Sequence, residues 1–151
     1  MSQTPIKPIL ANACAQAATA EEAAYRITRE IGGRKALIVA LDDEASRVVD
    51  RVAERPWGGA QFFPKPDVDA VTAEYEDADV VIAVGTADAD ADVASALARA
   101  GAERGIMLAG LILGENDEVG HAVAALRPYA RNLMITQDED DVAAVLTALR
   151  A

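Results

Sequence analysis

From Lys35 to its end, the chain alternates short apolar runs with amphipathic segments, and this pattern limits its possible folds more than any other feature. The first run, residues 36–41, is apolar throughout, which is typical of a strand that is covered on both faces. The next segment places Val48, Val49 and Val52 on one side of a helix. The same alternation continues through four further strands. Parallel strands with helices on both faces of the sheet are therefore predicted.

The lengths of the apolar runs indicate which strands are central. The predicted strands are residues 36–41, 60–63, 79–84, 106–113 and 133–135, and the helices between them include residues 68–75 and 119–126. Because the first, third and fourth runs are the longest, we expect the second and fifth strands at the edges. The predicted fold is a doubly wound, five-stranded parallel sheet of order 2-1-3-4-5, as in flavodoxin-like and Rossmann-like proteins. Its switch point lies between the first and third strands.

An additional helix is predicted before the first strand. Residues 12–31 carry alanine and isoleucine at three- and four-residue spacings, and Gly32-Gly33 ends the pattern. The 151 residues suit a single domain, divided into an N-terminal extension and helix, residues 1–33, and a flavodoxin-like α/β domain, residues 34–151. Small side chains allow close backbone approach. We therefore expect this helix to pack against the domain or against a second copy, which would make a homo-oligomer.

Composition argues against several classes of partner. The net charge of -11 at pH 7 repels nucleic acid and anionic membrane surfaces, so neither is expected to bind. No apolar stretch approaches the roughly 20 residues that cross a bilayer, and residues 1–10 lack the pattern of a signal peptide. The single cysteine, Cys14, has no internal disulfide partner, as is usual in a reducing compartment. A cytoplasmic location is predicted.

Acidic residues gather in the loops that follow the five predicted strands. Fifteen of the 25 carboxylates lie there, with Lys65 as the only base. They are Asp42, Asp43 and Glu44; Asp67 and Asp69; Asp88, Asp90 and Asp92; Glu115, Asp117 and Glu118; and Asp138, Glu139, Asp140 and Asp141. Arg34, Arg104 and Arg131 instead precede strands, which predicts a positive opposite edge. Ligands of open α/β sheets usually bind at the edge where the strands end.

Two interpretations of this acidic edge remain open. Each helix begins where a strand ends, and Asp or Glu at a helix N-terminus is worth roughly 0.3–1 kcal/mol, so ordinary capping explains much of the pattern. Capping, however, needs one acid per helix rather than three. We expect Asp42, Asp43, Glu44, Asp88 and Asp90 to face one another across the switch-point crevice, where oxygen ligands suit Mg²⁺. A basic protein surface is the other partner that such an edge would favour.

Several other sites are excluded or weakly supported. The turn after the first strand has no glycine and three acids, so no nicotinamide, flavin or nucleotide is expected in the standard phosphate-binding manner. An EF-hand starting at Asp88 fails, because Val93 and Arg99 stand where Gly and Glu are needed. His121, the only histidine, lies three residues after Glu118, where an exposed ion pair is the simpler role. No catalytic triad is indicated.

Residues 35–151 resemble a response-regulator receiver domain in length and in strand–helix order, and residues 37–44 resemble its first strand and acidic pair. The resemblance implies that this pair holds Mg²⁺. It also implies a degenerate receiver. Val84 or Gly85 occupies the position where the family has its phosphate-accepting Asp, and Gln137 lies near the position of the family's Lys. Residues 78–114 are similar in spacing to tubulin-like cell-division GTPases, without their glycine-rich loop. Glu44 with Asp88 and Asp90 is similar to the topoisomerase-primase metal fold, which uses Mg²⁺ for phosphoryl chemistry.

These observations lead to three hypotheses about function. The preferred one is a non-catalytic regulatory or protein-interaction module whose acidic strand-end edge contacts a basic protein or holds a divalent cation. The enzymatic alternative is a Mg²⁺-dependent phosphoryl-handling enzyme that uses the same acids. The third is an oligomerising subunit of a larger complex, joined through the helix of residues 12–31.

Overall fold

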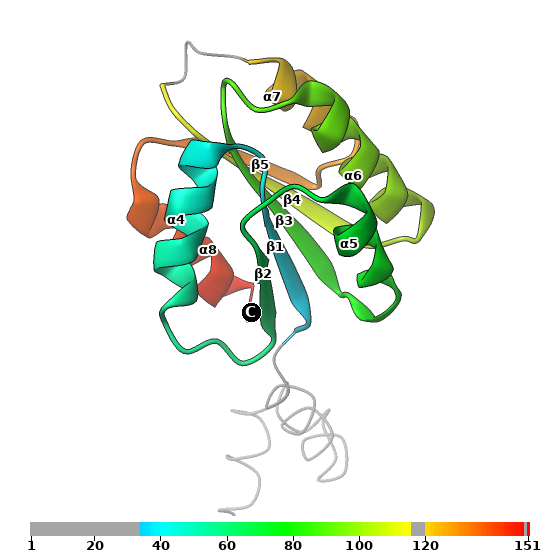
Figure 1. The fold of residues 1–151 in the computed structure, drawn as a ribbon, viewed down its shortest axis with the longest axis horizontal. Coiled ribbons are helices and arrows are strands. Elements are labelled where there is room, and N and C mark those ends of the chain that lie inside the picture. The colour runs from blue at the N-terminus through cyan, green and yellow to red at the C-terminus, as the bar shows by residue number, and fades with distance from the viewer. Residues whose placement is uncertain (1–33, 116–119, 150) are drawn as a thin grey trace, which may run out of the picture. The chain divides into compact units, whose positions relative to one another are not determined.

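A parallel five-stranded sheet forms the centre of the computed structural model, which describes residues 34–115, 120–149 and 151 (Figure 1). The strand order is β2-β1-β3-β4-β5, and all four neighbouring pairs are parallel. The predicted doubly wound fold of order 2-1-3-4-5 is thereby confirmed. The helix predicted at residues 12–31 lies outside the described residues, as do Cys14, Asp117 and Glu118.

Strands and helices alternate along the whole described domain. The elements are β1 (Ala36–Ala40), α4 (Asp43–Ala53), β2 (Ala60–Phe63), α5 (Val68–Ala73), the 3-10 helix η1 (Tyr75–Asp77), β3 (Val80–Thr86), α6 (Ala91–Glu103), β4 (Met107–Leu113), α7 (His121–Leu126), β5 (Asn132–Thr136) and α8 (Glu139–Ala148). None of the described helices combines the length and the apolar character needed to span a membrane.

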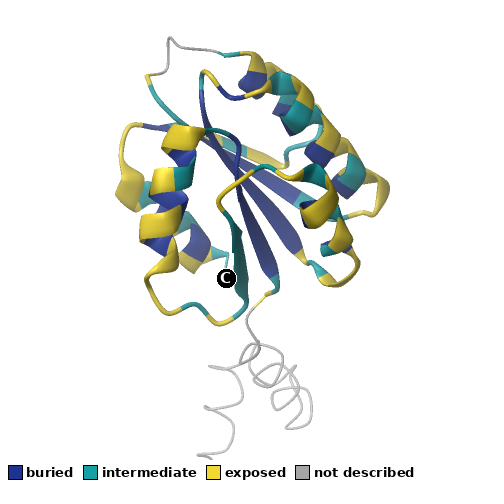
Figure 2. Cartoon of the chain, viewed as in Figure 1, coloured by how far each residue is buried: buried dark blue, intermediate teal, exposed yellow. Residues whose placement is uncertain are grey.

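Two layers of helices cover the sheet (Figures 1 and 2). On one face, alternate residues of β1 and β3 such as Leu37 and Val81 form a core with α5, α6 and α7. On the other face, residues such as Ile38 and Ile82 pack against α4 and α8. Every residue of β1 and β3 is buried, since helices lie on both sides of these strands. This is why their sequences are continuous apolar runs rather than alternating ones.

Several element boundaries differ from the prediction by a residue or two, and two of these differences matter for the edges of the sheet. β3 continues to Thr86 instead of ending at Val84, because Gly85 and Thr86 remain paired with Ile112 and Leu113 of β4. The helix predicted at residues 68–75 is instead α5 followed by the separate 3-10 turn η1. The apolar run alone did not reveal the extra two strand residues, because glycine is depleted in strands and threonine, although it favours strands, is not apolar.

The sequence predicted a positive charge at the opposite edge of the sheet, where the strands begin. In the structure this edge is not uniformly positive. Lys35 Nζ lies 3.6 Å from a carboxylate oxygen of Glu74 and 3.6 Å from one of Asp77. The backbone N–H of Lys35 also donates to Asp79 Oδ2 at 2.9 Å. Glu74, Asp77 and Asp79 therefore offset the charge of Lys35 at this edge.

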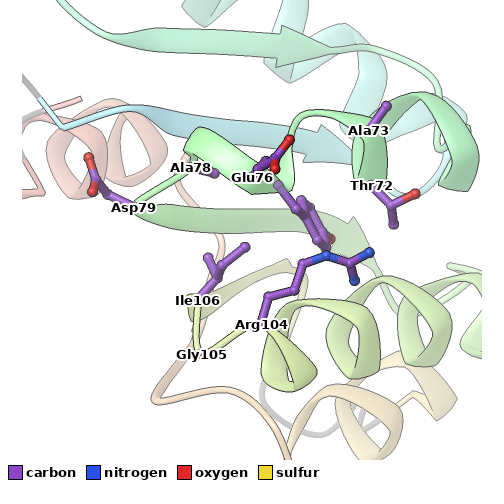
Figure 3. Close-up of a pocket in the computed structure, with 9 residues that line it drawn as sticks. Thr72, Ala73, Glu76, Ala78, Asp79, Arg104, Gly105 and Ile106 are labelled. Carbon is purple, nitrogen blue, oxygen red and sulfur yellow. The ribbon is translucent and has the colours of Figure 1, made fainter.

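A cleft of about 680 Å³ opens at this same edge, between η1 and the end of α6 (Figure 3). Its lining includes Thr72, Glu76, Asp79 and Arg104 around the buried Tyr75. The guanidinium carbon of Arg104 lies 5.9 Å from the centroid of the Tyr75 ring, within the range of a cation–π contact. The Tyr75 hydroxyl donates to the carbonyl oxygen of Leu97 at 3.0 Å, which joins η1 to α6.

The buried Tyr75 predicts a loss of stability at alkaline pH. Burial raises the pKa of Tyr75 to about 12 from its ordinary value of 10.0, an effect that the nearby Arg104 partly offsets. Because the native state holds this proton more tightly than the unfolded chain, the stabilisation is complete below pH 10. It is lost as the pH rises through about 12, and amounts to on the order of 2 kcal/mol. Urea unfolding should show this loss in the wild type.

The matched variant is Tyr75→Phe. It should be less stable near neutral pH by about 1 kcal/mol, because the hydrogen bond to Leu97 is lost. Its free energy of unfolding should then fall less than that of the wild type between pH 10 and 12. Identical pH profiles for the two proteins would contradict the assignment to Tyr75.

Candidate functional site

A cleft of about 740 Å³ lies at the edge where the strands end, the usual ligand-binding edge of an open parallel sheet. Its walls are supplied by α4, by the ends of β3 and β4 with the loops that follow them, and by the turn from β5 into α8. Its lining residues are Glu44, Val48, Thr86, Ala87, Asp88, Leu113, Gly114, Glu115, Gln137 and Glu139. We refer to this space as the strand-end cleft. Four of its side chains are carboxylates, so its electrostatic potential favours positively charged ligands.

Asp42 joins the ends of β1 and β3 at the base of this edge. Its Oδ1 accepts from the backbone N–H of Ala45 at 2.8 Å and thereby caps α4. Its Oδ2 accepts from the backbone N–H of Thr86 at 2.6 Å and from the Thr86 hydroxyl at 3.0 Å. Both oxygens of Asp42 are therefore occupied by hydrogen bonds within the fold. The nearly buried Thr86 has its donors satisfied by the same carboxylate.

The end of β5 repeats this arrangement. The Thr136 hydroxyl donates to Asp141 Oδ2 and accepts from the backbone N–H of Asp138 at 3.1 Å. The Thr86 hydroxyl likewise accepts from the backbone N–H of Asp88, at 3.3 Å. At both strand ends a buried threonine thus orients the turn into the next helix, with a nearby Asp as the acceptor of its hydroxyl proton.

Capping accounts for one Asp at each of four helices. Asp42, Asp67, Asp90 and Asp138 are the N-caps of α4, α5, α6 and α8, and each accepts from a backbone N–H of the first turn. Ordinary capping therefore explains the presence of these four acids at the edge. At α7 the N-cap is Gly120, which has no side chain to serve in this way.

Other acids of the edge are exposed and are not N-caps. These residues are Asp43, Glu44, Asp69, Asp88, Asp92 and Glu115, together with Glu139 and Asp140. Glu139 pairs with Arg51, and Asp140 Oδ1 lies 3.6 Å from Arg55 Nη2. For Glu44, Asp88 and Glu115, no ion pair forms with any base among the described residues. Their charge therefore faces the cleft without a counter-charge from this part of the chain.

The predicted magnesium ligands have different positions. Glu44 and Asp88 both line the strand-end cleft, whereas Asp42 and Asp90 accept backbone hydrogen bonds as helix caps. Asp43 lies in the first turn of α4. Within residues 34–115, 120–149 and 151, no three His, Cys, Asp or Glu side chains form a group that could hold a metal ion. The five-residue magnesium site stays a prediction, with Glu44 and Asp88 as the two carboxylates that share the cleft.

Carboxylates are the only ionisable side chains in the described lining of the cleft. Its described lining contains neither histidine nor cysteine nor lysine, and the Thr86 hydroxyl is already held by Asp42. His121 begins α7 with an exposed side chain and is not among the lining residues. Gln137 follows β5 directly and reaches the cleft where the receiver resemblance expects a lysine.

The sequence reasoning did not single out Thr86 and Thr136. A detectable signal was present, since each is the last residue of an apolar strand and is followed two positions later by an Asp. This spacing is typical of a turn in which the threonine hydroxyl accepts from the backbone N–H of that Asp.

Compared with known proteins, the chain matches no protein-family model and none of the curated proteins. The resemblance to receiver domains therefore stays a prediction.

Replacing Asp42 should destabilise the fold far more than replacing its neighbour. Asp42→Ala removes three hydrogen bonds and leaves the backbone N–H of the buried Thr86 without an acceptor. The expected loss is about 2–4 kcal/mol in the free energy of unfolding, measured by urea denaturation. Asp43→Ala, the control, removes an exposed first-turn acid and should change stability little. Comparable losses for the two variants would contradict this role for Asp42.

Proposed function

We propose that this chain is a non-catalytic interaction module that binds a basic protein surface through its acidic strand-end face. This face is defined by Asp43, Glu44, Asp69, Asp88, Asp92 and Glu115, all of which are exposed. The proposal depends on one observation: Glu44, Asp88 and Glu115 line one cleft without an ion-pair partner among the described residues.

The fold does not require these acids. Asp42, Asp67, Asp90 and Asp138 already cap the helices, so the further carboxylates at the edge add mutual repulsion to each cap. A basic partner would neutralise this repulsion and would be steered toward the face by its field. The unequal distribution supports the same partner, since acids and bases offset one another at the opposite edge, around Lys35.

A regulatory or binding role is favoured over catalysis by the chemistry of the cleft. Carboxylates and amides line it, and the one hydroxyl group in its lining donates to Asp42. General acid–base catalysis usually needs a group whose pKa lies near the working pH. The described lining offers no histidine, cysteine or lysine for that purpose.

A divalent cation is the alternative occupant of the cleft. Glu44 and Asp88 line the same space, and Mg²⁺ is commonly held by one or two carboxylates with waters in its remaining positions. In that case the face would act either as a cation-dependent contact or in Mg²⁺-assisted phosphoryl chemistry. The cytoplasmic location expected from the sequence agrees with either occupant, a basic protein or a divalent cation.

Binding of a fluorescently labelled oligolysine peptide tests the proposed partner class. The triple variant Glu44→Gln, Asp88→Asn, Glu115→Gln should raise the peptide's dissociation constant at least about tenfold, because it removes the charges that line the cleft. Fluorescence anisotropy at low and at physiological salt measures the effect, and added salt should weaken binding.

The control carries the same change in net charge at other positions. Glu54→Gln, Glu76→Gln, Glu103→Gln alters three exposed carboxylates, none of which lines the strand-end cleft. It should retain most of the affinity. Equal losses for the two triple variants would show that only net charge matters, and would overturn the proposal.

A thermal melt in the presence of Mg²⁺ tests the alternative occupant. If the cleft binds the cation, the melting temperature of the wild type rises with Mg²⁺ concentration. At a Mg²⁺ concentration a hundred times the dissociation constant, the free energy of unfolding increases by about 2.7 kcal/mol. Asp88→Asn should abolish the rise, whereas Asp69→Asn, an exposed acid outside the cleft lining, should preserve it. A wild-type melting temperature that does not respond to Mg²⁺ would contradict the hypothesis that the cleft binds a divalent cation.

A further inference from the structure

We infer that β5 is a dimerisation edge, along which two copies of the chain pair antiparallel and join their sheets into one. β5 pairs with β4 through five residues on one side. Among the described strands none covers its other side, so β5 presents a row of backbone N–H and C=O groups. Such an edge is a template for pairing with another chain.

β5 lacks the features by which proteins usually protect an edge strand. Asn132–Thr136 contains no charged residue and no proline, and its register with β4 is uninterrupted by a bulge. The opposite edge, β2, is different. It has four residues and is followed by Pro64 and Pro66, which cannot donate to a neighbouring strand. The contrast identifies β5 as the edge that is open to a partner.

The side chains beside this edge form an apolar surface. Met134 is 44% exposed and is the only exposed large hydrophobic residue in the described part of the chain. A groove of about 320 Å³ runs beside it between β5 and α8, and its lining includes Leu111, Val145 and Leu149. Apolar side chains from a second copy would fill this groove and remove Met134 from water.

The alternation of β5 fixes how two copies would pair. Leu133 and Ile135 pack on the face that α6 and α7 cover, so Met134 points to the face of α8. In one continuous sheet, residues directly opposite must point to the same face. A two-fold axis at Met134 satisfies this rule: Met134 lies opposite its own copy, and Leu133 lies opposite Ile135 of the second copy.

Charges at the two ends of β5 are complementary in this pairing. Arg131 precedes the strand and is exposed, while Gln137, Asp138 and Glu139 follow it, also exposed. With the axis at Met134, Arg131 of one copy lies opposite Gln137 of the other and beside Asp138, the cap of α8, and Glu139, which also pairs with Arg51. The contact occurs twice because the interface is symmetric. This complementarity favours a second copy over an unrelated chain as the occupant of the edge.

Sedimentation velocity on the full chain tests the proposal. At about 100 µM, above the dissociation constants of micromolar interfaces, the wild type should sediment as a dimer. Met134→Lys places two ammonium groups opposite each other and should raise the dimer dissociation constant at least about tenfold. Gln61→Lys puts the same residue on the β2 edge and should leave the dimer intact. Circular dichroism should confirm that both variants are folded.

A charge reversal tests the register itself. Arg131→Asp should weaken the dimer, because it brings carboxylates of the two copies together, and adding Gln137→Arg should restore it by creating the opposite pair. A monomeric wild type would overturn the proposal. So would a dimer that Met134→Lys leaves unchanged, since association would then occur through another surface, such as the N-terminal helix predicted at residues 12–31.

Discussion

Burial of both faces of β1 and β3 is the constraint on which the rest of the structure depends. Every residue of both strands is buried, so a charged side chain within them would lose most of its hydration without a partner. Polar chemistry is thereby confined to the strand ends and to the loops beyond them. Thr86, at the last position of β3, is the first point at which the buried strands reach a polar partner, and that partner is Asp42. The strand-end cleft begins where this burial ends.

The same constraint separates the acids of the edge into two groups. The N-cap acids are drawn into hydrogen bonds with backbone N–H groups, because helix N-termini and buried threonines leave donors that must be satisfied. Other acids, such as Glu44 in the first turn of α4 and Asp88 between Thr86 and the cap Asp90, are not caps and lie exposed around the cleft. A dense acidic edge is therefore compatible with stability, and its capping members contribute the most to it.

Much of the fold followed from the sequence because burial on both faces leaves a direct mark on it. The apolar runs of β1, β3 and β4 identified the central strands, and their lengths gave the order of the sheet. The site was less accessible to this reasoning. Spacing along the chain places Asp42 and Asp88 at one edge, but it does not say which carboxylate turns inward to a backbone amide. Asp42 bonds to the backbone because β3 extends two residues past the apolar run, which brings the N–H of Thr86 to its carboxylate.

The two proposed surfaces meet at Gln137 and Glu139, which line the strand-end cleft and follow β5, but the pairing keeps the two acidic faces apart. An antiparallel pairing at β5 reverses the strand direction between copies, so the strand ends of one copy lie beside the strand starts of the other. The two acidic faces would then lie on opposite edges of the joined sheet. A single compact basic partner would not reach both, and each face would bind its own partner with the affinity of one site. Dimerisation through β5 would thus double the number of binding sites without the gain in avidity that two adjacent sites provide.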